Sequence, residues 1–114
     1  MSQKLLQFIE TEVFTRRIEA TGSSDILVAI QQDLLTSLKK WPVVSGTGGA
    51  RKGRIADKQS GQGKRGGYRY LYFYIERRET IYLLFIYGKT EQYDLTSDQK
   101  KVIAKFVKAI EEEK

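Results

Sequence analysis

Two neighbouring segments, 68–76 and 80–88, constrain the fold of this chain more than any other part of its sequence. Both are dense in tyrosine, phenylalanine, leucine and isoleucine, the residue types that favour β-strands, and only three residues separate them. A break of that length, filled by Arg77, Arg78 and Glu79, predicts a tight turn. The two segments are therefore expected to pair as an antiparallel hairpin.

Neither face of this hairpin is polar enough to remain simply in contact with solvent. Side chains alternate between the two faces of a strand, so segment 68–76 can be divided by position. One face carries three tyrosines, Tyr70, Tyr72 and Tyr74. The other carries one arginine and three apolar residues, Arg69, Leu71, Phe73 and Ile75. One face must pack against helices, and the other must be covered by another part of the chain or serve in function.

The flanking sequence predicts the other elements of a single α+β domain that covers residues 1–114. Apolar residues at helical spacing predict two helices before the hairpin and one after it, the last opened by a capping box at Thr96 and Gln99. The expected elements are strand 4–10, helix 11–20, a helix capped by Ser23 or Ser24 that ends before Pro42, strand 50–57, the hairpin and the last helix. The predicted fold class is a small, mainly antiparallel β-sheet with helices packed on one face, in the order β-α-α-β-β-β-α.

The positive charge of the chain is concentrated in its centre. The formal net charge is +6, yet residues 1–38 have a balance of −2 and residues 90–114 a balance of −1. Residues 39–89 hold twelve basic and three acidic side chains, a balance of +9. A solvated charged face is one explanation, but solubility does not require one sign to gather in one region. The distribution favours a polyanionic partner such as RNA, DNA or an anionic membrane.

Two absent residue types limit the chemistry of the chain. It contains no cysteine and no histidine, which removes disulfides, Cys- or His-based zinc sites, and Ser-His or Cys-His nucleophiles. We expect no cofactor and no bound metal. No apolar run reaches the roughly 18 residues that span a membrane, and the first ten residues lack the features of a signal peptide. We therefore expect a soluble cytoplasmic protein that does not associate with membranes.

Basic residues on two predicted strands indicate where a polyanion binds. Lys52 and Arg54 lie on the same face of strand 50–57, about 7 Å apart, which is close to the spacing of successive phosphates. Arg69 returns on the next strand after a glycine-rich loop. Further RNA-binding candidates surround them: Arg51, Lys58, Lys64 and Arg65. The set predicts a cationic pocket that grips a phosphate and stabilises charge on it, or else a basic RNA-binding surface without chemistry.

Three blocks of sequence resemble the RelE/HigB toxin family of toxin–antitoxin systems. They are GTGGARK at 46–52, GKRGGYRYLYF at 63–73 and YGKTEQYDLT at 87–96, in the family's order and at family-like spacing. The opening segment 8–15 is also similar to the family's start, so the resemblance covers almost the whole chain. It implies a compact domain with a RelE-like order of elements. It further implies a toxin that enters the ribosomal A site and cuts mRNA there.

The resemblance also implies partners and site residues. The partner is a cognate antitoxin, in the HigB branch usually a helix-turn-helix protein like HigA, and contact with DNA arises only through it. Lys52 and Arg54 resemble the family's paired basic residues on the strand before the loop. Arg69 resembles its phosphate-binding arginine, and Lys89 the basic residue at the end of the hairpin.

Two positions depart from the best-known family pattern. Thr90 stands where some members have an arginine, and Thr96 where some carry a tyrosine as general base. Tyr93 is the nearest phenol in sequence and becomes the acid/base candidate, with a packing role as the equal alternative. The identity of the general base stays open at this point.

The absence of histidine bears on how such an enzyme works. A free-standing ribonuclease usually pairs a histidine base with a histidine acid, whereas lysine and tyrosine normally titrate near about pH 10. A site built from them is slow unless the RNA is held in line for attack by its own 2′-hydroxyl. We therefore expect a metal-independent endoribonuclease that depends on the ribosome to position mRNA. The alternatives are a non-catalytic module that binds nucleic acid or the ribosome, and a gyrase inhibitor of the ParE kind.

Overall fold

The computed structural model describes residues 6–56 and 67–113 of the 114-residue chain. Along the chain it contains, in order, β1 (Gln7–Glu10), α1 (Glu12–Thr21), α2 (Ser24–Thr36), β2 (Arg51–Ile55), β3 (Tyr68–Ile75), the 3-10 turn η1 (Glu76–Arg78), β4 (Thr80–Gly88) and α3 (Ser97–Glu112). None of these helices combines the length and apolar character needed to cross a lipid bilayer.

The expected hairpin forms the centre of a four-stranded sheet in the order β1-β4-β3-β2. β3 pairs antiparallel with both β4 and β2, and β1 adds to β4 as a parallel outer strand. Two of the three pairings are antiparallel, so the prediction of a mainly antiparallel sheet in an α+β domain is confirmed. The turn between β3 and β4 places Glu79 in the left-handed region at φ 49°.

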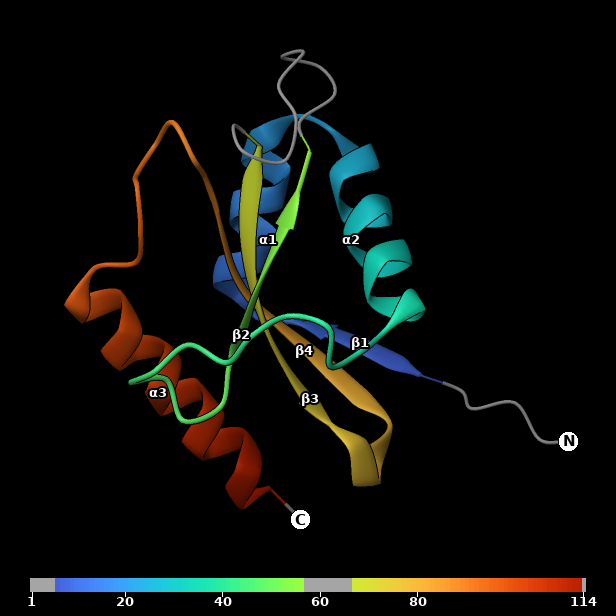
Figure 1. Cartoon of the computed structure of the whole chain (residues 1–114), viewed down its shortest axis with the longest axis vertical. Helices are drawn as coiled ribbons and strands as arrows, with labels where there is room; N and C mark the ends of the chain where they lie inside the picture. Colours follow the sequence, from blue (N-terminus) through green and yellow to red (C-terminus); the bar gives the residue numbers. More distant parts are fainter. Residues whose placement is uncertain (1–5, 57–66, 114) are drawn as a thin grey trace, which may run out of the picture.

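Helices cover both faces of the sheet, so the expectation of helices on one face is wrong. α1 and α2 pack on the face that carries Tyr70 and Tyr72, where they bury Phe14, Ile30 and Leu34. α3 packs on the opposite face, and its buried residues are Ile103, Val107 and Ile110. Figure 1 shows the sheet between α3 on one side and α1 and α2 on the other. The physical reason is that both faces of β3 are apolar, and each needs its own cover.

A β-bulge in β4 changes which side chains face α3. Leu71 of β3 pairs with Phe85, but the next residue, Tyr72, pairs with Leu83, so β4 holds one residue more than its partner. That extra residue is Leu84, and both Leu84 and Phe85 pack in the cluster beneath α3. Beyond the bulge the alternation of β4 is therefore shifted by one position.

The observed helix ends agree only partly with the ends predicted from the sequence. Thr11 caps α1 by accepting a hydrogen bond from the backbone N–H of Phe14, and Gly22 ends the helix at φ 71°. The capping box at the start of α3 is confirmed: Thr96 and Gln99 each accept from the other's backbone N–H. α2, in contrast, stops at Thr36, several residues short of Pro42, and Ser23 stands at its N-cap without a side-chain hydrogen bond.

A carboxylate on α2 explains how the chain after that helix is held. Asp33 Oδ2 accepts from the Trp41 indole at 2.7 Å and from the Tyr70 hydroxyl at 2.7 Å, while Oδ1 accepts from Lys40 at 2.8 Å. The Tyr72 hydroxyl donates to the carbonyl of Leu38 at 2.9 Å. These bonds join α2, the segment that leads to β2, and the centre of β3. They fix where β2 begins.

One glycine of β2 is required by this arrangement. The Tyr70 ring lies against Gly53, its register partner, and a Cβ at Gly53 would stand 2.6 Å from the Tyr70 hydroxyl oxygen. Tyr70 is fully buried and bonded to Asp33, so the ring has no room to retreat. The glycine lets β2 pass close to the Tyr70 ring.

The Asp33 carboxylate is predicted to make stability depend on acid. Burial raises its pKa, but the hydrogen bonds from Lys40, Tyr70 and Trp41 outweigh burial and hold the pKa below its usual value. Its contribution is therefore present above the pKa of the unfolded chain, about 4, and is lost as the pH falls through the lower folded-state pKa. Asp33→Asn should cost roughly 1–3 kcal/mol at neutral pH, and urea unfolding should show that gap closing toward about pH 2.

The control for that measurement is Asp25→Asn, which alters an exposed carboxylate of the same helix. Its cost should remain a few tenths of a kcal/mol, roughly what one charge in a first helical turn provides. A gap for Asp33→Asn that is equally wide at both pH values would contradict the role given to the carboxylate.

Gly53→Ala is predicted to destabilise the fold by roughly 1–3 kcal/mol, because the added methyl group overlaps a ring that cannot move. Gly88→Ala is the matched control, since the nearest atom to its Cβ is 3.8 Å away and its φ is not in the left-handed region. The control should be neutral or slightly stabilised through the unfolded state. Thermal unfolding of both variants measures the difference, and equal melting temperatures would be inconsistent with the close approach.

Candidate nucleic-acid interface

Three side chains lie in a row across the sheet at the end where β3 begins. Arg54 of β2 is the register partner of Arg69 of β3, and Arg69 is the partner of Tyr87 of β4. Directly opposed residues share one face, so the Cβ atoms of all three lie on the α3 side of the sheet. Lys52 lies two residues along β2 and shares that face. The structure thus brings together the three cations that the sequence predicted on adjacent strands.

The two arginines of the row differ in environment. Arg54 is exposed, and its guanidinium carbon lies 5.6 Å from the centroid of the Trp41 ring. Arg69 is only 6% exposed and makes a long, 3.5 Å hydrogen bond from Nη1 to the carbonyl of Tyr68. Burial lowers the pKa of Arg69, the Tyr87 phenol opposes that shift, and the charge of Arg54 adds to it. Arginine remains protonated even so, because its normal pKa is above about 12.

The third member of the row is a buried phenol. Tyr87 is 1% exposed, and among the side chains that the structure describes its hydroxyl is a buried polar atom with no hydrogen-bond partner. Burial raises its pKa to about 12; the nearby Asp94 carboxylate contributes to the rise, and Arg69 acts against it. The hydroxyl is therefore neutral at physiological pH and is able to donate a hydrogen bond.

The segment 88–96, which joins β4 to α3, closes this end of the sheet and is fixed to β2. Lys52 Nζ lies 3.2 Å from Asp94 Oδ1, and the same oxygen accepts from the backbone N–H of Leu95 at 2.7 Å. The bond from Leu95, helped by Lys52 against the effect of burial, holds the pKa of Asp94 below its usual value. Lys52 thus has an anionic partner in the absence of any ligand.

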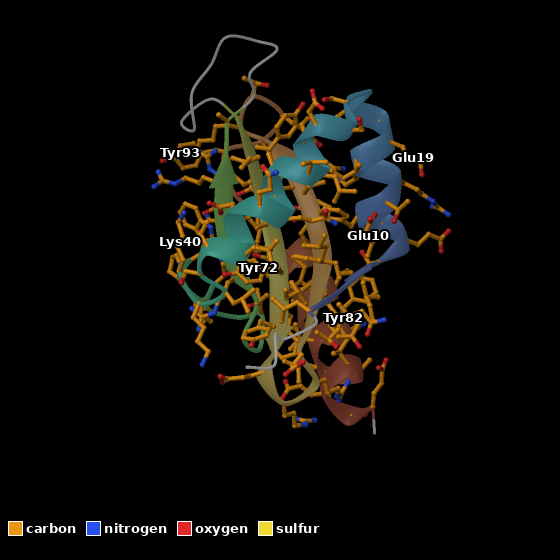
Figure 2. The ribbon with its side chains drawn as sticks, turned by 90° about the vertical axis from the view of Figure 1, so that its right-hand side faces the viewer. Glu10, Glu19, Lys40, Tyr72, Tyr82 and Tyr93 are labelled. Atoms are coloured by element: carbon orange, nitrogen blue, oxygen red, sulfur yellow. The ribbon has the colours of Figure 1, made fainter. Side chains whose placement is uncertain are left out.

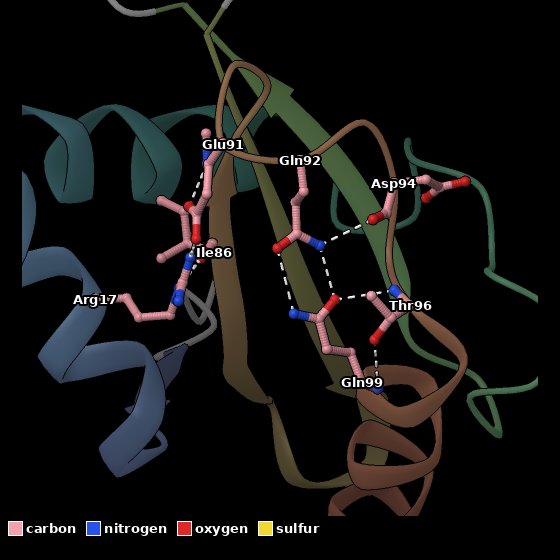
Figure 3. Close-up of polar contacts among 8 residues, drawn as sticks. Arg17, Ile86, Glu91, Gln92, Asp94, Thr96 and Gln99 are labelled. Carbon is pink, nitrogen blue, oxygen red and sulfur yellow. Dashed lines mark hydrogen bonds and ion pairs between the residues drawn. The ribbon is translucent and has the colours of Figure 1, made fainter.

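Two further contacts hold the same segment, and Figure 3 shows both. Arg17 of α1 donates to the carbonyl of Ile86 and to the carboxylate of Glu91, which lowers the pKa of Glu91. At the other end, Gln92 and Gln99 join their side-chain amides, with Gln92 Nε2 donating to Gln99 Oε1 at 2.7 Å. The segment is therefore tied to α1, β2 and α3.

Lys89 and Tyr93, the remaining catalytic candidates, lie together on this segment. Lys89 Nζ donates to the carbonyl of Tyr93 at 3.1 Å and stands 3.9 Å from the centroid of the Tyr93 ring. Tyr93 is 82% exposed, and Figure 2 shows it at the side of the molecule opposite to Glu10 and Glu19. An aromatic ring this open, with a cation beside it, is available to stack on a base.

Some predicted RNA-binding residues lie elsewhere. Arg51 is the register partner of Tyr72, so it faces α2, and its Nη1 donates to the carbonyl of Trp41 at 2.7 Å. That bond holds the segment before β2. Lys58, Lys64 and Arg65 lie outside the residues that the structure describes.

The two positions that depart from the family pattern also have clear surroundings. Thr90 is exposed at the turn after β4. Thr96 is the N-cap of α3, and its hydroxyl accepts from the backbone N–H of Gln99 at 3.1 Å. A threonine in this role is part of the helix start, and it offers no group that titrates near neutral pH.

The arrangement suits an anion more than a metal ion. Lys52, Arg54 and Arg69 project from neighbouring positions, with a neutral phenol beside them. Within residues 6–56 and 67–113, no three carboxylates, histidines or cysteines come close enough together to ligate a metal. Guanidinium and ammonium groups at this spacing bind phosphate oxygens and stabilise charge that develops on them.

No protein-family model matches this chain. The resemblance to RelE/HigB toxins therefore rests on the sequence blocks themselves.

Two residues of this end of the sheet were not anticipated from the sequence. The sequence places Tyr87 only in a strand and at the start of the resembling block 87–96, and Asp94 only in that block. Their nearness to Arg69 and Lys52 follows from the hairpin register and from the path of segment 88–96. Neither had a local signal in the sequence, because the β-bulge decides which face Tyr87 takes and the path of segment 88–96 decides where Asp94 lies.

The Lys52–Asp94 contact is predicted to fasten segment 88–96 weakly and in a salt-dependent way. A double-mutant cycle with Lys52→Ala and Asp94→Ala, followed by urea unfolding, should give a coupling of roughly 0.2–1 kcal/mol that falls toward about 1 M salt. The more exposed Lys39–Glu76 pair, 2.9 Å apart, serves as the control and should couple less. Zero coupling at low salt would mean that this contact does not hold the segment.

Proposed function

We propose that this protein is the toxin of a toxin–antitoxin system, and that it cleaves translated mRNA as a ribosome-dependent endoribonuclease. A cognate antitoxin, of the helix-turn-helix HigA-like kind, would neutralise it. The observation that carries the proposal is the placement of Lys52, Arg54 and Arg69 on one face of adjacent strands. The resemblance of the surrounding sequence blocks to RelE/HigB toxins supplies the reaction.

The electrostatics of this face support RNA as the ligand. Arg69 is nearly buried, so a phosphate that reaches it meets a guanidinium screened little by water. Arg54 and Lys52 stand beside it with greater exposure and can contact neighbouring phosphates. Lys89 and the open Tyr93 ring then supply a cation and a stacking surface for a base.

The proposed reaction needs no atom that the RNA does not itself supply. The 2′-oxygen forms a bond to the adjacent phosphorus, the bond from phosphorus to the 5′-oxygen breaks, and a cyclic phosphate and a free 5′-hydroxyl result. One proton leaves the 2′-hydroxyl and one reaches the 5′-oxygen. Arg69, Arg54 and Lys52 would stabilise the negative charge that gathers on the phosphate oxygens as the reaction proceeds.

The same set of residues accounts for dependence on the ribosome. No histidine is present, and Tyr93, the acid/base candidate, is an exposed phenol with no carboxylate contact among its described interactions. The usual pairing of a histidine base with a histidine acid is therefore absent from this site. Holding the 2′-oxygen in line with the bond that breaks is then the main source of rate, and the ribosome would provide that positioning.

A non-catalytic binding module is the second candidate, and Thr96 favours it. Some relatives carry a tyrosine base at that position, whereas here the side chain caps α3. A protein with the same cationic face but no base would occupy RNA or the ribosome without cutting. A gyrase inhibitor of the ParE kind is a third candidate that the dense cationic face favours less.

Expression without a partner is predicted to arrest growth, and mapping of the 5′ ends of mRNA should then show cuts phased with codons inside reading frames. Arg69→Ala should abolish the cuts, because it removes the buried cation on the phosphate. Arg16→Ala is the matched control: Arg16 is exposed on α1 and pairs only with Glu12 among its described contacts. It should remain fully toxic.

Other results would support a different function or a different role for Arg69. Arrest with intact transcripts indicates the binding module, and arrest with trapped DNA breaks indicates a gyrase inhibitor. A folded Arg69→Ala variant that still cuts mRNA would remove Arg69 from the phosphate site. Circular dichroism of the purified variant decides whether it is folded.

A further inference from the structure

A buried hydroxyl without a partner is costly, and Tyr87 carries one. Leaving a buried donor unsatisfied costs roughly 1–3 kcal/mol, and such groups are few in folded proteins. A phenylalanine would fill the same space in β4 without that cost. The hydroxyl of Tyr82, in the same strand and on the same face, does have a partner, Glu113 Oε2 at 3.3 Å. The unsatisfied hydroxyl of Tyr87 is therefore a candidate for contact with a ligand.

The β-bulge places the phenol beside the buried arginine. Beyond Leu84 the shifted alternation turns Tyr87 to the α3 side, where Arg69 is its direct register partner. Cβ atoms of such partners lie about 4.5–5.5 Å apart. Bulges often serve to re-aim a side chain next to a functional site. Arg69 and Tyr87 thus present a cation and a neutral hydroxyl from adjacent strands.

A weak ion pair lies close to Tyr87 in the absence of a ligand. Asp94 lies near enough to raise the pKa of Tyr87, and it is held across the sheet by Lys52. The Lys52 and Asp94 side chains are 29% and 52% exposed, so their ion pair contributes little to stability. An incoming phosphate competes for Lys52, and with Lys52 on the phosphate Asp94 loses its link to β2.

We propose that the Tyr87 hydroxyl and the Arg69 guanidinium together form an oxyanion site, which receives a non-bridging oxygen of an RNA phosphodiester and which the Lys52–Asp94 pair covers when it is empty. The choice of RNA rests on the proposed function; the oxyanion site itself does not. In the site the phenol donates its hydrogen to the phosphate oxygen and gains the partner that it lacks. Lys52 exchanges Asp94 for the phosphate.

The role assigned to Tyr87 is that of a donor and not of a base. Its pKa of about 12 keeps the phenol protonated near neutral pH, so it has a hydrogen to give and no charge to repel an anion. A neutral donor beside an arginine stabilises an oxyanion, as in sites that bind transition states of acyl and phosphoryl transfer. Tyr93, in contrast, is exposed to solvent, and the Lys89 ammonium makes a cation–π contact with its ring.

The test uses Tyr87→Phe, which removes one oxygen, and inorganic phosphate as the probe, followed by calorimetric or NMR titration. The affinity for phosphate should fall about tenfold or more, as expected for a lost hydrogen bond to a charged group. Without ligand the variant should melt at the same temperature as the wild type or higher, because the unsatisfied hydroxyl is gone. Tyr82→Phe is the matched control and should leave phosphate affinity unchanged.

A second pair of variants tests the cover independently of Tyr87. Asp94→Asn retains an oxygen to accept from the Leu95 N–H but loses the charge that engages Lys52. It should bind phosphate severalfold more tightly than Asp98→Asn, which removes the same charge from an exposed position in the first turn of α3. Equal affinities for these two variants would overturn the cover.

The outcomes separate this inference from the proposed function. Wild-type protein that binds no phosphate, or Tyr87→Phe that binds it as well as wild type, overturns the oxyanion site. Weaker binding by Tyr87→Phe supports the site even if the wild type cuts no mRNA, in which case only the ribonuclease proposal fails. Wild type and Tyr87→Phe that cut mRNA in a translation reaction at equal rates would overturn the inference and leave the ribonuclease in place.

Discussion

The need to cover both faces of the β3–β4 hairpin determines the rest of this structure. One face carries the tyrosines that pack under α1 and α2, and the other carries the apolar residues that pack under α3. Because α3 is the next element after β4, segment 88–96 has to cross from the end of the sheet to α3 (Figure 1). That crossing brings Asp94 over Lys52 and Tyr87. The cationic face thus lies at the end of the sheet from which segment 88–96 leads to α3.

Several parts of the fold were readable from the sequence because they depend on local patterns. The bounds of β4 and the capping box of α3 both follow from residue type and spacing. Lys52, Arg54 and Arg69 share a face because pairing of adjacent strands requires it. The cover of the second face was missed, since an apolar face does not say which element packs on it.

The β-bulge in β4 is a feature that residue type and spacing do not predict. Strict alternation along β4 would put Tyr87 on the face of Ile81 and Leu83, under α1 and α2. The inserted Leu84 lies within an unbroken apolar run, so nothing in that run marks it as the extra residue. The bulge therefore has no local signature in the sequence, yet it places Tyr87 beside Arg69.

The place of β2 at the outside of the sheet has a consequence for how copies of this protein behave at high concentration. An outer strand presents backbone groups on which a strand from another molecule can pair. Among the described residues, the chain before β2 covers only the start of this edge: Val43 bridges to Arg51, and the Lys52 N–H donates to the carbonyl of Pro42. The side chains of Lys52 and Arg54 stand along this strand, and like charges on two such edges repel each other. The cations that would hold a nucleic acid therefore also keep the molecules from aggregating edge to edge.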